Sequence, residues 1–166
     1  PNGRAVYAAS NNSLTVIDTG RRAAVTTLTI NPNTTGIAVA PDGGTAYIAN
    51  LFSVQLTRLD AATNTLIAPL TMFTDRLRGG FGFMAPSPDG RTMYIANKTN
   101  ESFGIIDLTG GPSSLLKPTV WPVAVAVAPD GRTVYGAGCK QICTPGFLAV
   151  FDVATQRFGA EIALDS

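Results

Sequence analysis

One loop of this sequence combines charged side chains with glycines in a pattern suited to anion binding. The segment TDRLRGG places Asp75, Arg76 and Arg78 directly before two glycines. Two arginines can hold a carboxylate or a phosphate through bidentate hydrogen bonds, and the glycines let the backbone approach closely. The alternative, which we favour, is an Asp–Arg pair on a solvated loop. Asp75, Arg76 and Arg78 are therefore retained as candidate ligand-binding residues.

Trp121 is the only tryptophan of the chain and a further candidate for ligand binding. Its indole ring offers a large apolar surface with one hydrogen-bond donor, which suits contact with a ligand or a partner. The alternative is that the ring packs between structural units. We favour packing and keep Trp121 as a candidate.

The two cysteines stand close together in the segment GCKQICTPG. A zinc site lacks ligands, because the chain has no histidine and no further cysteine. The spacing C-x3-C also differs from the thioredoxin and haem-attachment motifs. We predict a structural disulfide between Cys139 and Cys143, with free thiols as the alternative. A disulfide indicates an oxidising compartment, so we expect a periplasmic, extracellular or cell-surface location.

The composition argues against several classes of function. Charged residues make up 14% of the chain and the net charge is +1, so nucleic-acid binding has little support. The longest apolar run, 123–128, is too short to span a bilayer. Without histidine, the chain lacks the commonest general base and metal ligand. We expect no catalytic residue, metal site or cofactor in this stretch, no nucleic-acid partner and no membrane span.

A repeated turn sequence organises the elements that must position these candidates. Pro-Asp-Gly recurs at Pro41, Pro88 and Pro129, and the segment at Pro1 is a diverged copy, with spacings of 40, 47 and 41 residues. A period near forty with strand-like content is typical of a propeller blade. Proline suits the first central position of a type I turn, and glycine suits the left-handed position that follows.

Each repeat unit reads as four short strands. An apolar strand runs into the turn, a second strand carries a tyrosine, and a third strand ends in aspartate before a polar turn leads to the fourth. Four such antiparallel strands form one blade. The first unit begins at the turn and so lacks its innermost strand. We treat residues 1–166 as a single β-propeller region with blades at about 1–30, 31–72, 73–120 and 121–166.

The phrases PDGRTMYIAN and SLTVIDT resemble the YVTN-type β-propeller repeat. Its consensus runs through Pro-Asp-Gly, Tyr-Val-Ala/Thr-Asn and Val-Ile-Asp-Thr, and the resemblance covers essentially the whole chain. It implies an all-β fold, a β-propeller with four consecutive four-stranded antiparallel blades. Because the first blade lacks its innermost strand, we expect the chain to be part of a larger propeller, completed by parent-chain blades or by a second copy.

The repeat also accounts for most of the acidic residues. Three aspartates occupy the Pro-Asp-Gly turn and four end the third strands, where a short side chain can accept hydrogen bonds from nearby backbone N–H groups. We therefore predict that these seven serve the scaffold: Asp18, Asp42, Asp60, Asp89, Asp107, Asp130 and Asp152.

Function is expected in the loops, which vary in length while the strands do not. We predict a non-catalytic binding or assembly module of an exported or cell-surface protein, which presents its loop face to a protein or glycan partner. The alternative is part of a propeller enzyme. Proteins similar to the YVTN-type repeat family include lactonases and quinone- or haem-dependent dehydrogenase subunits. In that case the catalytic residues would lie outside this stretch.

Overall fold

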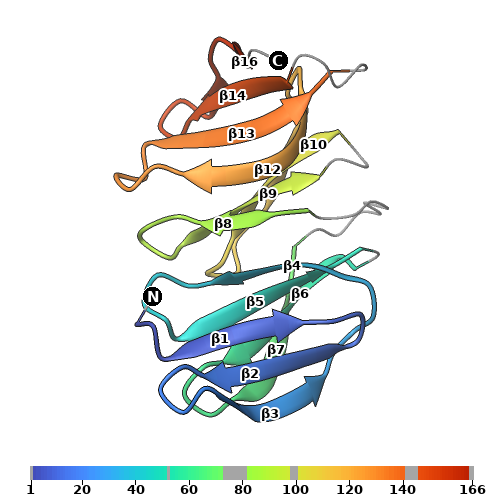
Figure 1. The fold of residues 1–166 in the computed structure, drawn as a ribbon. Helices are drawn as coiled ribbons and strands as arrows, with labels where there is room; N and C mark the ends of the chain where they lie inside the picture. The colour runs from blue at the N-terminus through green and yellow to red at the C-terminus, as the bar shows by residue number, and fades with distance from the viewer. Residues whose placement is uncertain (1, 52, 73–81, 98–100, 141–145, 165–166) are drawn as a thin grey trace.

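The computed structural model describes residues 2–51, 53–72, 82–97, 101–140 and 146–164, and in these segments every regular element is a β-strand (Figure 1). The strands form four antiparallel sheets that follow one another along the chain, here called blades 1 to 4. Blade 1 contains β1 (Ala5–Ala9), β2 (Ser13–Asp18) and β3 (Ala23–Thr29). Blade 2 contains β4 (Thr34–Val39), β5 (Thr45–Asn50), β6 (Gln55–Asp60) and β7 (Thr65–Thr71).

The second half of the chain repeats this order. Blade 3 contains β8 (Met84–Pro86), β9 (Thr92–Asn97), β10 (Ser102–Asp107) and β11 (Ser114–Leu116). Blade 4 contains β12 (Trp121–Val127), β13 (Thr133–Cys139), β14 (Gly146–Asp152), β15 (Arg157–Phe158) and β16 (Ile162–Leu164). The prediction of four consecutive antiparallel blades, the first with three strands, is confirmed.

The last strand of blade 4 differs from the prediction. The sequence FGAEIALDS (158–166) reads as one fourth strand, but the structure has two short strands, β15 and β16, which both pair with β14. The interruption follows β15, where the N–H of Gly159 donates to the carbonyl of Val150 at 2.7 Å. Residues 165 and 166 lie outside the described part of the chain.

The Pro-Asp-Gly turns adopt the conformation expected from their residues. The glycines are left-handed, with φ of 75° at Gly43, 70° at Gly90 and 70° at Gly131. Each glycine N–H donates to the carbonyl three residues earlier, at 2.8–2.9 Å. The three turns join β4 to β5, β8 to β9 and β12 to β13 on one side of the molecule (Figure 1). We call this side the turn face and the opposite side the loop face.

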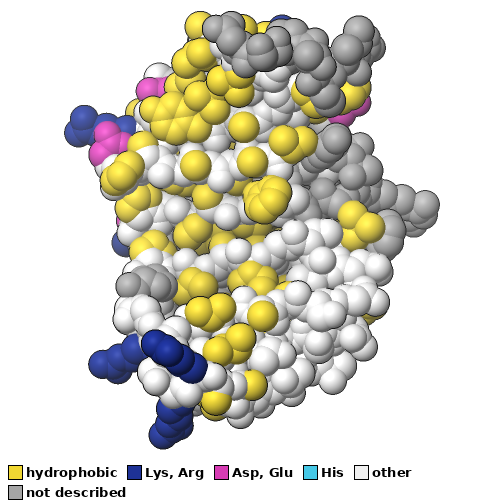
Figure 2. All heavy atoms as spheres, viewed as in Figure 1, with side chains coloured by type: hydrophobic (Ala, Val, Ile, Leu, Met, Phe, Trp, Pro, Cys, Tyr) yellow, Lys and Arg dark blue, Asp and Glu magenta, His cyan; other side chains and the backbone are white. Residues whose placement is uncertain are grey.

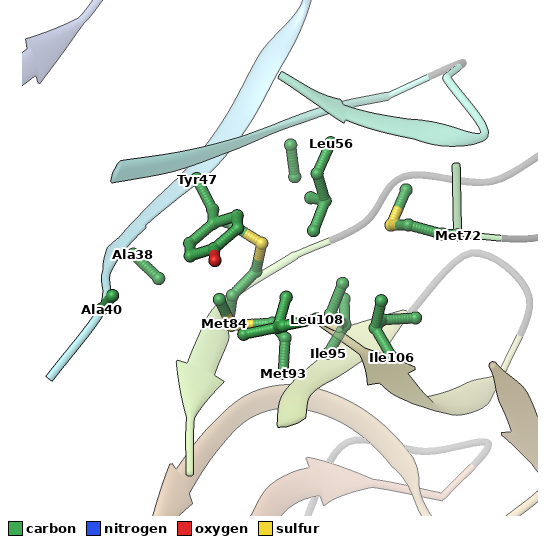
Figure 3. Close-up of a cluster of buried hydrophobic side chains, with 11 residues drawn as sticks. Ala38, Ala40, Tyr47, Leu56, Met72, Met84, Met93, Ile95, Ile106 and Leu108 are labelled. Atoms are coloured by element: carbon green, nitrogen blue, oxygen red, sulfur yellow. The ribbon is translucent and has the colours of Figure 1, made fainter. Parts of the chain in front are cut away.

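The hydrophobic core lies between successive blades rather than within any one of them. Between blades 2 and 3, Tyr47 is directed toward Met84 and Met93 (Figure 3). Between blades 3 and 4, the rings of Phe103 and Phe151 pack at a centroid distance of 5.1 Å. A third cluster joins blades 1 and 2, with Leu14, Val16 and Ile30 against Ala46, Ile48 and Leu59. Each blade therefore depends on its neighbours to bury its side chains.

Candidate functional site

The structure places one of the candidate ligand-binding residues of the loop face. Asp75, Arg76 and Arg78 lie outside the described residues, so the anion site stays a prediction. Trp121 is the first residue of β12 and stands opposite Cys139 on β13, partly buried. A Cβ atom on Gly138 would collide with the carbonyl oxygen of Trp121, so glycine is what lets β12 and β13 approach here.

Of the two cysteines in the predicted disulfide, the structure describes one. Cys139 is buried at the loop-face end of β13, and Cys143 lies outside the described residues. The pairing of Cys139 with Cys143 therefore stays a prediction.

A network of asparagine side chains holds the loop face between blades 1 and 2. The Asn50 amide donates to the carbonyl of Asn31 at 2.7 Å and to that of Pro32 at 3.2 Å. The Asn33 N–H donates to Oδ1 of Asn11 at 2.8 Å, and the Asn33 carbonyl accepts from the N–H of Leu51 at 2.9 Å. Asn33 is left-handed, with φ of 61°, a conformation that asparagine tolerates well. The link between the two blades is thus fixed by loops of both.

The sequence patterns did not predict this network. The one signal for it is the asparagine that ends Tyr-Ile-Ala-Asn in two repeats, at Asn50 and Asn97, both buried. A polar side chain repeated at a strand end and then buried must have hydrogen-bond partners. The partners of Asn50 belong to a link of variable sequence, so the motif alone does not reveal them.

Aromatic and charged side chains occupy the loop-face ends of blades 3 and 4. Phe83, which precedes β8, is 64% exposed, and its carbonyl accepts from the N–H of Ala96 near the end of β9. The Lys140 ammonium lies 4.6 Å from the ring centroid of Phe147 and 2.8 Å from a carboxylate oxygen of Glu161. The exposed Phe83 ring and the Lys140 ammonium over the partly buried Phe147 ring suit contact with a polar partner.

On the turn face, the seven repeat aspartates are engaged as predicted. Each accepts a hydrogen bond from a backbone N–H two or three residues later, at 2.7–3.0 Å. In four of them these bonds lower the carboxyl pKa, with threonine as the main donor at Asp60, Asp107 and Asp152 and the Ser87 hydroxyl at Asp89. The bonded form is the ionised one, so these carboxylates are held as turn acceptors.

Two clefts open on the turn face between blades. One of about 410 Å³ lies between blades 1 and 2 and is lined by Arg4, Tyr7 and Asp42 among others. One of about 220 Å³ lies between blades 3 and 4 and is lined by Tyr94 and Asp130 among others. Within the described segments, no three His, Cys, Asp or Glu side chains gather into a possible metal site. A helix able to cross a membrane is also not found there.

Three of the solved structures that resemble this chain match it over 99% of its length. They are hydrazine synthase of Kuenenia stuttgartiensis (19% identity, TM-score 0.87), the β-propeller domain of Myceliophteria thermophila Cps50 (Swd1) (13%, 0.77), and a putative 6-phosphogluconolactonase from Bacteroides uniformis (17%, 0.73). No family model and no curated protein matches.

The likeness establishes the fold. The four blades of the described residues are arranged as in a β-propeller. The chain spans 47%, 52% and 53% of the three matching chains, which is about half of each. At these identities the comparison carries over the architecture and leaves the activity to be argued from the site.

Proposed function

We propose that this chain is a non-catalytic binding and assembly module of an exported or cell-surface protein, with a YVTN-type repeat and a loop face that contacts a protein or glycan. The observation that carries the proposal is the engagement of all seven repeat aspartates by their own turns. Among the described residues, the other acids are Glu101 and Glu161, and Glu161 pairs with Lys140. Paired carboxylates poised for acid–base chemistry are therefore not found in that part of the chain.

The chemistry of the loop face supports a binding role. The network around Asn50 holds the backbone of the blade 1–blade 2 link in one conformation, so this face is preorganised for contact. Phe83 adds an exposed ring, and Lys140 with Phe147 adds a charge on an aromatic surface. Rings and hydrogen-bond donors on loops over a rigid scaffold are typical of surfaces that recognise sugars or peptides.

The exported location and the assembly role have separate support. The close pair of cysteines favours an oxidising compartment. Since the chain covers about half of its structural neighbours, further polypeptide is needed for a full ring: parent-chain blades or a second copy.

The binding role can be tested on a printed array of bacterial and host oligosaccharides and a matched panel of extracellular protein domains. The comparison is between wild type, the loop-face variants Phe83→Ala and Trp121→Ala, and the turn-face control Arg132→Ala. We expect the loop-face variants to lose at least tenfold in apparent affinity for a wild-type ligand, and Arg132→Ala to bind as wild type. Loss in the turn-face control alone, or hydrolysis of 6-phosphogluconolactone by the wild type, would contradict the proposal.

A further inference from the structure

The interfaces between the blades repeat one arrangement of side chains. The tyrosine of a second strand packs onto the blade that follows in the chain, and Tyr47 and Tyr94 are only 7% and 3% exposed. The residue before that tyrosine packs onto the preceding blade, and Ala46, Met93 and Val134 are all 0% exposed. We call the tyrosine side of a blade its forward face and the opposite side its rear face.

The turn face adds a second contact to the interface between blades 2 and 3 and to that between blades 3 and 4. A Cβ atom placed on Gly90 would lie 3.7 Å from Cδ of Pro41 in the preceding blade. A Cβ atom on Gly131 would lie 3.3 Å from Cδ of Pro88 in the same way. Gly90 and Gly131 thus each stand against the proline of the turn in the preceding blade.

The rear face of blade 1 carries one half of this arrangement. Val6 occupies the position of Ala46, Met93 and Val134, yet it is 50% exposed, and Ile17 stands beside it on β2. Gly3 is left-handed, with φ of 69°, and no atom of the described residues lies within 4 Å of its Cβ position. The glycine and the apolar residue are both present and face solvent.

The forward face of blade 4 carries the other half. Tyr135 occupies the position of Tyr47 and Tyr94 and is 37% exposed, with Val150 opposite it on β14. On the same face Leu148 stands opposite Ile162, which is 50% exposed. Pro129 of the adjoining turn is exposed. Figure 2 shows hydrophobic side chains gathered over β12–β14 of this blade.

We propose that the forward face of blade 4 binds the rear face of blade 1 in a second copy of this chain, with Tyr135 over Val6 and Pro129 against Gly3. The two faces carry the two halves of the interface between successive blades. Its side-chain packing recurs at all three interfaces, and its proline–glycine contact is seen at two of them. A contact between unlike faces closes a ring when the rotation allows it, and two copies of residues 1–166 supply eight blades. Each copy also spans about half of the propeller chains that it matches.

This inference rests on the proposed assembly role and concerns the end blades rather than the loop face. It is tested by sedimentation velocity of residues 1–166 between about 1 and 100 µM, concentrations at which weak self-association is visible. The wild type is expected at twice the chain mass of 17.2 kDa. Val6→Glu and Tyr135→Glu each bury an unpaired charge at the contact, so each variant alone is expected to be monomeric.

An equal mixture of Val6→Glu and Tyr135→Glu provides the decisive comparison. Each variant keeps the face that the other has lost, so one intact contact can form, and the mixture is expected to give a dimer. The matched control is Ile67→Glu, because Ile67 is 38% exposed but lies on the outer strand of blade 2, away from both end faces. That variant is expected to remain dimeric.

Three results would contradict the proposed contact between two copies of the chain. A wild type that is monomeric at all concentrations, dimers that persist in either single variant, or a mixture that stays monomeric would overturn the inference. Far-UV circular dichroism of each variant verifies that it is folded. A monomeric wild type that still binds through its loop face would leave the proposed function standing and assign the end faces to other polypeptide.

Discussion

Gly131 in the turn of blade 4 stands directly against Pro88 in the turn of blade 3, with 3.3 Å between its Cβ position and the proline Cδ. Gly131 is also left-handed, with φ of 70°. Two independent constraints therefore require glycine here: the backbone conformation and the proximity of the neighbouring turn. Because the same pair recurs at Gly90 and Pro41, the turns align successive blades as well as closing hairpins.

We expect Gly131→Ala to lower the free energy of unfolding by about 2–3 kcal/mol, since it adds left-handed strain and crowds Pro88. The matched control is Gly110→Ala. Gly110 is also left-handed, with φ of 97°, but no atom of the described residues lies within 4 Å of its Cβ position. That variant is expected to lose about 1 kcal/mol less than Gly131→Ala. Urea unfolding measures both, and equal losses would show that the turn-to-turn contact has no energetic effect.

Asn50→Ala tests the asparagine network of the loop face. The substitution removes the donor to the carbonyls of Asn31 and Pro32, so we expect unfolding to become easier by about 1–3 kcal/mol. Asn2→Ala is the control, because the exposed Asn2 side chain accepts one local hydrogen bond, and its loss should cost under about 0.5 kcal/mol. Comparable effects of the two substitutions on thermal stability would argue that the network is not structural.

The turn carboxylates predict a loss of stability in acid. Hydrogen bonds hold the pKa of Asp60 and Asp107 below the usual 3.8, so the folded state binds protons less readily than the unfolded state. Their contribution is complete above that value and is lost as the pH falls through and below it. Melting temperatures measured from pH 6 to pH 2 should decline most below about pH 4. In Asp60→Asn the decline should be smaller, and an unchanged slope would contradict this assignment.

The predicted disulfide between Cys139 and Cys143 is tested by intact mass under alkylating, non-reducing conditions. We expect no alkylated thiol in the denatured, unreduced protein and two after reduction. Under the same denaturing conditions Cys143→Ser should give one alkylated thiol. Two alkylatable cysteines without reduction would contradict the bridge and remove the main support for an exported location.

How far the sequence predicts the structure depends on whether a feature recurs. The blades, the left-handed turn glycines and the aspartate hydrogen bonds recur in every repeat, so pattern alone predicts them. The Asn50 contacts depend on a link of variable sequence, and the split between β15 and β16 occurs once, at Gly159. The exposed faces at Val6 and Tyr135 emerge only when equivalent positions are compared for burial in three dimensions.

Binding of partners at the loop face can be followed through the fluorescence of Trp121. The chain has one tryptophan, and it lies at the loop-face end of blade 4 beside Cys139. Titration with a ligand from the array should shift its emission along a saturable curve, with the same midpoint as binding measured by calorimetry. Calorimetric saturation with unchanged Trp121 emission, combined with loss of binding in Arg132→Ala, would place the ligand on the turn face and overturn the proposal that partners bind the loop face.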